Sequence, residues 1–111
     1  MNRVLLIGRL QGDPTYHFTE GGMDIVRFAL DTETSGACSG IHHCLAYGPA
    51  AIDLHTHLVH GTLLSVAGRL AYRSQRGAVR STVVVEAYSY LDGIAGIRKA
   101  VKRPSGVGAV G

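Results

Sequence analysis

Hydrophobic and polar residues alternate over much of the first half of this chain, and a period of two predicts β-strands. Residues 2–10 alternate from Val4 to Leu10, so that one face of the segment is apolar or glycine. Residues 24–32 and residues 41–47 repeat the pattern. Three strands are therefore predicted before residue 48.

The segments between these strands have the composition of turns and loops. Residues 11–15, QGDPT, combine Gly, Asp and Pro and predict a turn. Residues 16–23, YHFTEGGM, predict a hairpin connection with Gly21–Gly22 at its tip. Residues 33–40, ETSGACSG, predict a loop rich in serine and glycine.

The period changes after residue 48, which predicts one short helix within residues 49–61. Pro49 suits a first helical turn, and Gly61 suits the residue after a helix ends. The apolar stripe has the spacing i, i+3, i+7 and consists of Ala51, Leu54 and Leu58.

Strand periodicity then returns in two further segments separated by a predicted tight loop at 74–79. The segments are residues 62–73, with Leu64, Val66, Gly68 and Leu70 facing inward, and residues 80–91, with Val83, Val85 and Ala87 facing inward. Three strands, a helix and two strands is the element order of the OB-fold. We therefore predict an all-β, five-stranded Greek-key barrel with one helix between its third and fourth strands.

Composition and charge refine this prediction. A chain of 111 residues that is 46% hydrophobic suits one domain, and 15 glycines favour turns and bulges. The N-terminal apolar segment is too short and too alternating for a signal peptide, so a cytoplasmic protein with two reduced thiols, Cys38 and Cys44, is expected. No apolar run has membrane-spanning length, and no membrane partner is expected.

The positive charge is concentrated at the C-terminal end. Residues 1–92 carry seven arginines and eight acids (7 − 8 = −1), whereas residues 93–111 carry four basic residues and no acid. We therefore divide the chain into a barrel domain, 1–92, and a basic tail, 93–111. The tail has the spacing of a short amphipathic helix ending before Pro104 that adds phosphate contacts, but it fits a solvated, frayed terminus at least as well.

The segment HHCLAYG, residues 42–48, contains the first candidate for binding chemistry. In a strand, His43, Leu45 and Tyr47 share one face, and the smaller Cys44 lies on the other. An outward tyrosine can stack on a base of single-stranded nucleic acid. It can equally be a partly buried edge residue with its hydroxyl in water.

Outward arginines recur on several predicted strands, and cations of this kind can follow a phosphate backbone. They are Arg3, Arg9, Arg27, Arg69 and Arg73. Tyr72 is a weaker second aromatic candidate, because simple alternation places it on the inner face.

Several of these segments, in this order, resemble the bacterial single-stranded DNA-binding protein family. They are MNRVLLIGRLQGDP, YHFTEGG, IVRFALDT, HHCLAYG, LLSVAGRLAYRS and VVVEAYSYL, within residues 1–92. The resemblance implies an OB-fold that assembles, usually as a homotetramer with a dimer as the alternative. It also implies a protein that coats single-stranded DNA in replication, recombination and repair, associated with the nucleoid.

The resemblance also assigns roles to individual residues. Tyr47 falls where the family has a base-stacking aromatic, and Phe18 matches an aromatic of the first hairpin. The positions of Arg3, His43 and Arg73 are commonly basic and face DNA, and His42 matches a histidine near the subunit interface.

The sequence departs from the family in two respects. It has no tryptophan, and Ile41 and Gln75 stand where relatives often have one. The family's acidic C-terminal tip, which recruits partner enzymes, is replaced by a basic segment. A mobile-element or primosomal relative fits as well as a housekeeping protein, so replication or repair proteins remain open as partners.

Two other classes of function are weighed against DNA binding. The histidines at 55, 57 and 60 and the two cysteines lack zinc-ligand spacing, and no arrangement of residues predicts catalysis, so neither a metal, a cofactor nor an enzymatic activity is expected. A protein-interaction OB module with weak nucleic-acid binding is the second alternative, favoured by the near-neutral barrel. We predict a non-enzymatic, sequence-tolerant single-stranded DNA-binding protein.

Overall fold

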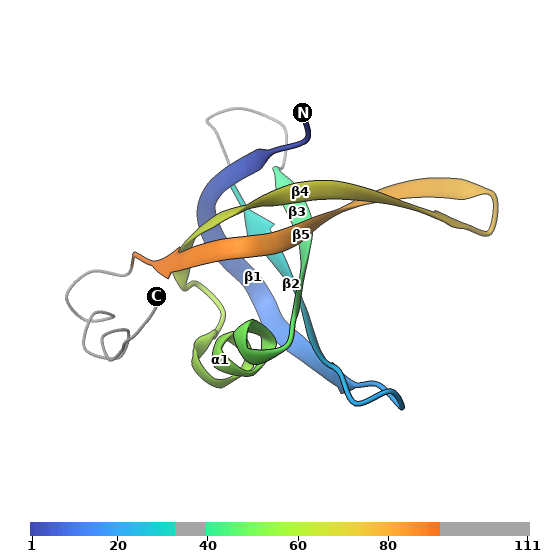
Figure 1. Cartoon of the computed structure of the whole chain (residues 1–111). Coiled ribbons are helices and arrows are strands. Elements are labelled where there is room, and N and C mark those ends of the chain that lie inside the picture. Colours follow the sequence, from blue (N-terminus) through green and yellow to red (C-terminus); the bar gives the residue numbers. More distant parts are fainter. Residues whose placement is uncertain (33–39, 92–111) are drawn as a thin grey trace.

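The computed structural model describes residues 1–32 and 40–91, and in them five strands form a closed barrel in the order β1-β2-β3-β5-β4. Figure 1 shows the arrangement. The predicted order of elements and the OB-fold class are confirmed. The elements are β1 (Val4–Phe18), β2 (Asp24–Asp31), β3 (Ile41–Tyr47), α1 (Pro49–His57), β4 (Leu63–Gln75) and β5 (Ala78–Tyr90). Cys38 and the basic tail lie outside the described residues.

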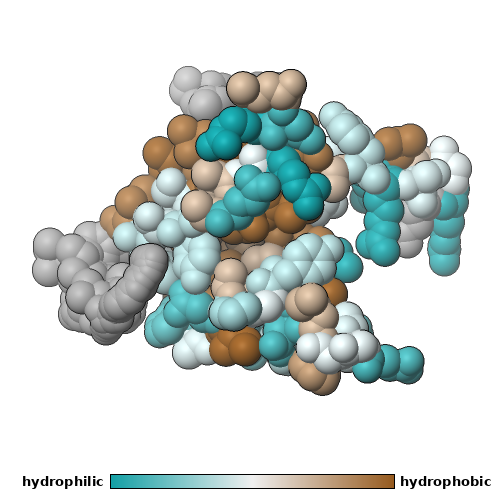
Figure 2. Space-filling view, viewed as in Figure 1, coloured by the Kyte–Doolittle hydropathy of each residue, from teal (hydrophilic) through white to brown (hydrophobic). Residues whose placement is uncertain are grey.

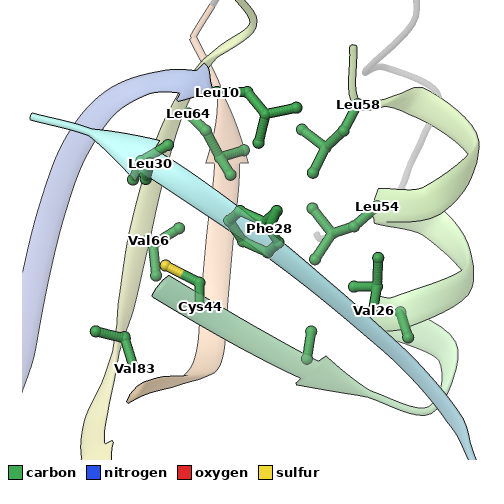
Figure 3. Close-up of a cluster of buried hydrophobic side chains, with 12 residues drawn as sticks. Leu10, Val26, Phe28, Leu30, Cys44, Leu54, Leu58, Leu64, Val66 and Val83 are labelled. Carbon is green, nitrogen blue, oxygen red and sulfur yellow. The ribbon is translucent and has the colours of Figure 1, made fainter. Parts of the chain in front are cut away.

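The core is formed where the inward faces of the strands meet the apolar stripe of α1. Val26, Phe28 and Leu30 of β2 are buried as predicted, and Leu54 of α1 is fully buried. Figure 3 shows these side chains converging between the helix and the strands. The helix packs against β1, β2 and β3 and so covers one end of the barrel.

The turn predicted at residues 11–15 is wrong, because β1 runs through this segment. The pairing of β1 with β2 shifts between Gln11 and Thr15, and Gly12 there has a φ of 76°. This irregularity is a β-bulge, which bends a strand without ending it. The Gly and Pro residues therefore mark a bend, and the reversal comes later, where Gly22 donates to the Thr19 carbonyl at 3.0 Å.

The loop predicted at 74–79 is also shorter than expected. Strands β4 and β5 continue to a two-residue turn at Arg76 (φ 53°) and Gly77 (φ 81°), as a tight hairpin requires. Figure 1 shows the end of this hairpin projecting well beyond the barrel wall. We call its outer part, residues 71–82, the arm.

A bulge in β5 corrects the predicted inner face of that strand. Ala67 pairs with Ala87 but Gly68 pairs with Val85, so Glu86 is an extra residue. The alternation changes phase there, and Ala87, predicted to face inward, is exposed. The next inward residues of β5 are Tyr88 and Tyr90, which pack against the core.

The glycine opposite this bulge has a steric role. The backbone carbonyl of Val84 lies so close to Gly68 that a Cβ there would stand 1.9 Å from its oxygen. Only glycine permits this approach of β4 and β5.

The helix ends at His57, earlier than the predicted stop at Gly61. Leu58 is extended, and its N–H donates to the Leu54 carbonyl at 2.9 Å. Gly61 instead donates to the carbonyl of Leu10 on β1 at 2.8 Å, so it belongs to the barrel wall. Within the described residues, no helix is long and apolar enough to cross a membrane.

Candidate nucleic-acid interface

The outer face of the barrel wall carries most of the predicted binding residues, because period two separates them from the core. In the β2–β3 ladder Arg27 pairs with Leu45, and Tyr47 pairs with Ile25. Between the outward residues of β3, Cys44 and Ala46 point inward and are buried. The small inner set of HHCLAYG therefore fits the core, as predicted.

Tyr47 ends β3 with its side chain 45% exposed. Gly48, with a φ of 69°, then turns the chain into α1. The ring therefore stands at the surface on the edge of the wall, where one side can meet a flat partner. His43 lies two outward positions away along the strand, about 13 Å by strand rise.

A groove of about 550 Å³ crosses the outer face between the wall and the arm. It gathers side chains from all five strands, and its charged members are Arg27, Arg73, Arg80 and Asp13. Three positive charges and one negative charge give it a net charge of +2 (3 − 1), with His43 beside them. Three predicted binding residues, Arg27, His43 and Arg73, therefore line one groove.

Arg80 is a groove residue that sequence reasoning missed. It is the direct partner of Arg73 in the β4–β5 ladder, so both side chains project from the same face of the arm. The missed signal is the Arg76–Gly77 pair. A two-residue turn there places residue 80 opposite residue 73.

Two of the predicted arginines are already engaged with other groups of the protein. Arg9 donates from Nη1 to the carbonyl of Gly61 at 2.9 Å and lies opposite Asp31 in the β1–β2 ladder. Arg69 forms an ion pair with Glu86, 3.5 Å from Nε to the carboxylate. Arg3 precedes β1 and is exposed.

Two predicted aromatics lie on faces other than that of the groove. Tyr72 is 69% exposed, but its partner in the ladder is Ser81, so it projects from the side of the arm opposite Arg73. Phe18 is 58% exposed and shares its face of β1 with Tyr16, whose ring stacks on His55 of α1 at 4.8 Å. The structure therefore does not bring Phe18 or Tyr72 together with Tyr47.

A polar cluster ties α1 to β5 at the other end of the barrel. Tyr88 and Tyr90 each donate from the hydroxyl to one carboxylate oxygen of Asp53 at 2.8 Å, and His57 Nδ1 lies 3.0 Å from the other. Burial, and then the bond to Asp53, raise the pKa of Tyr88 well above that of a free tyrosine. Among the described residues, no three metal-ligating side chains are grouped to hold an ion.

Two other residues of β3, His42 and Cys44, lie on its inner face. His42 is half-buried, and its Nε2 lies 3.1 Å from the hydroxyl of Thr32. Burial raises the pKa of the Cys44 thiol to about 12, so it remains protonated at neutral pH.

An exposed apolar set lies on the outer face of β1, away from the groove. Leu5 and Ile7 are 72% and 56% exposed, and they pair with Ala67 and Ser65 of β4. Neighbouring apolar side chains exposed on a strand are typical of surfaces that bind another protein.

Comparison with known proteins matches this chain to one family. The profile of the single-strand binding protein family matches residues 1–90. The single-stranded DNA-binding protein of Clostridium perfringens is 34% identical over 100 residues, which are 83% of this chain and 67% of that protein. Proteins of the same description from Bacillus cereus, at 31%, and Staphylococcus aureus, at 33%, each match over 69% of this chain. The chain spans about half of the length of these two.

A solved structure agrees with the sequence comparison. A deletion mutant of the single-stranded DNA binding protein from Thermus aquaticus superposes with a TM-score of 0.72 and 25% identity. The match covers 82% of this chain and 41% of that one.

Proposed function

The chain belongs to the single-strand binding protein family, and from this premise we propose that it binds single-stranded DNA without strong sequence preference. Its role would be to protect the strand during replication, recombination or repair. The observation that carries the proposal is the groove in which Arg27, Arg73 and Arg80 converge on the outer face. Tyr47 is exposed on the same face of the wall.

The mechanism uses two kinds of contact. The three arginines hold the phosphate backbone, and the ring of Tyr47 stacks on a base at the end of β3. Stacking tolerates any base and contributes about 1–3 kcal/mol each, whereas phosphate contacts carry no sequence information. Stacking and phosphate contacts together explain why binding would not depend on the DNA sequence. Arg3 and His43 are secondary contacts, and the engaged Arg9 and Arg69 contribute to the field of the surface more than to direct bonds.

We further propose that the protein acts as a homo-oligomer, a tetramer with a dimer as the alternative. The exposed side chains of Leu5 and Ile7 support this, because burying them against a second copy removes apolar surface from water. Isologous contact of two such faces would extend the DNA path across subunits. The proposed role is non-enzymatic and belongs in the cytoplasm with the nucleoid.

A protein-binding OB module with weak nucleic-acid affinity is the second candidate. The same exposed face of β1 favours it, since Leu5 and Ile7 suit a different protein as well as a second copy. The basic groove favours the first candidate, because binding to a protein partner does not require it.

Fluorescence anisotropy of a labelled oligo-dT against a duplex of equal length tests the proposal. We expect tighter binding of the single strand, weakening as salt rises because counterions are released. Equal, weak binding of both nucleic acids that disappears at moderate salt would reject the proposal in favour of the protein-binding module.

A further inference from the structure

Two arginines face each other directly on the arm. Arg73 of β4 and Arg80 of β5 are Cα partners in the antiparallel ladder, and both line the groove. Side chains in such a pair start with Cβ atoms about 4.5–5.5 Å apart, and like charges there destabilise the sheet. This arrangement opposes the folding of the arm in the free protein.

Nothing within the described residues neutralises the pair. The ion pairs of Asp53 with His57 and of Arg69 with Glu86 involve other groups. Asp13 is the one acid among the residues that line the groove, and neither arginine bonds to it. Arg27 of β2 is a further positive charge in the lining of the groove, and His43 of β3 lies there as well.

The arm itself lacks acids that could compensate. Residues 71–82 contain Arg73, Arg76 and Arg80 and no Asp or Glu. In Figure 2 the arm extends at the right of the view with long hydrophilic side chains. Two guanidinium groups on neighbouring strands have the spacing and the donors to bind one phosphate between them.

We propose that Arg73 and Arg80 form a phosphate-bridging pair, a subsite that binds one phosphodiester group and thereby relieves the repulsion in the arm. The inference rests on the proposed function and identifies one place where the backbone is held. It makes one further claim, that each arginine lowers the stability of the free protein while raising its affinity for the strand. A general surface charge has no such opposite effects.

The test compares Arg80→Gln with Arg76→Gln, which removes the same charge from the same arm but from the turn, outside the groove lining. Circular dichroism follows thermal unfolding at low salt, since the chain has no tryptophan. We expect Arg80→Gln to raise the melting temperature by about 1–5 °C, as relief of one like-charge pair predicts. Arg76→Gln should change it less.

A double-mutant cycle measures the interaction between Arg73 and Arg80 separately from the effect of each arginine alone. Arg73→Gln should raise the melting temperature as Arg80→Gln does, and the double variant should gain little more, because the repulsion is removed only once. A fully additive gain, or a lower melting temperature in Arg80→Gln, would contradict the repulsion.

Binding is measured with oligo-dT and with an abasic deoxyribose-phosphate chain of equal length. Arg80→Gln should weaken both ligands by a similar factor. The double variant should lower the slope of log K against log salt by about 0.7, the value for one phosphate on a single strand. If Arg76→Gln weakens binding equally, the pair is no subsite and the inference fails, while the proposed function stands.

The two failures are distinguishable. If the wild-type protein binds neither oligo-dT nor the abasic chain, the proposed function fails. The melting temperatures in phosphate and in chloride of equal ionic strength then test the inference independently of DNA binding. Preferential stabilisation by phosphate that is lost in Arg80→Gln supports the pair, and equal stability in both salts overturns it.

Discussion

The helix end of the barrel and the arm differ in whether their charged side chains have partners within the protein. At the helix end, one carboxylate, Asp53, accepts hydrogen bonds from two tyrosines and contacts His57. At the arm, Arg73 stands opposite Arg80 without a carboxylate partner in the described residues. The helix end therefore satisfies its polar groups internally, and the arm leaves its charges for an external partner.

The difference indicates a division of labour between stability and binding. The helix end joins α1 to β5 and covers the core. Substitutions that remove buried side chains or hydrogen bonds there are therefore expected to destabilise the fold. The arm extends past the core, and most of its described side chains are exposed. Substitutions there should change affinity with little loss of stability. The arginine variants of the arm test the binding side of this division. Three further substitutions, in the core, at the exposed ring of Tyr47 and in the polar cluster, test whether stability and binding separate, from the largest expected effect to the smallest.

Leu54→Ala should give the largest effect, and on stability alone. Leu54 is fully buried between α1 and the barrel, and truncation of such a leucine leaves a cavity that costs about 2–5 kcal/mol. Urea unfolding followed by circular dichroism measures the loss, and the affinity for oligo-dT at low temperature should be unchanged. A variant that keeps its stability but loses its affinity would reverse the assignment of the two ends.

Tyr47→Ala should weaken binding of oligo-dT by about 5- to 150-fold, the equivalent of one stacked base at 1–3 kcal/mol. Unfolding should be little changed because the ring is 45% exposed. Tyr72→Ala is the matched control, since it removes an exposed ring from the arm on the side away from the groove. Equal losses in both variants would show that stacking is not localised at the end of β3.

The sequence predicted the wall of the barrel but not its irregularities. Val26, Phe28 and Leu30 keep a period of two, and their burial is a local consequence of that period. The extra residue Glu86 arises from pairing with β4, where Gly68 permits close approach, so Ala87 was assigned to the wrong face. Such a bulge depends on the partner strand and has no signal in its own segment.

The individual residues of the candidate site were easier to predict from the sequence than their grouping into one groove. Outward parity identified Arg27 and Arg73, and the family resemblance added His43; the fold brings all three into one groove. Arg80 escapes the sequence prediction because the loop predicted at 74–79 conceals its pairing with Arg73. The parity of Tyr72 was right, yet its side chain is exposed, because the arm extends beyond the part of the barrel that has a core.

The smallest effect is expected at the hydroxyl of Tyr88, where the polar cluster itself can be tested. Tyr88→Phe keeps the ring against the core and removes one hydrogen bond to Asp53, worth about 0.5–1.5 kcal/mol in general. The lower part of this range applies because the Asp53 side chain is 39% exposed. Urea unfolding at pH 8 should show this loss without a change in affinity.

The pH dependence of stability is a second test of the hydrogen bond between Tyr88 and Asp53. The pKa of Tyr88 is raised in the folded protein, so its contribution is complete below the unfolded value of about 10 and declines as pH rises above it. The free energy of unfolding of the wild-type protein should therefore fall above pH 10 more steeply than that of Tyr88→Phe. Parallel curves would mean that Tyr88 ionises as a free tyrosine does, and that the helix end does not depend on its bond to Asp53.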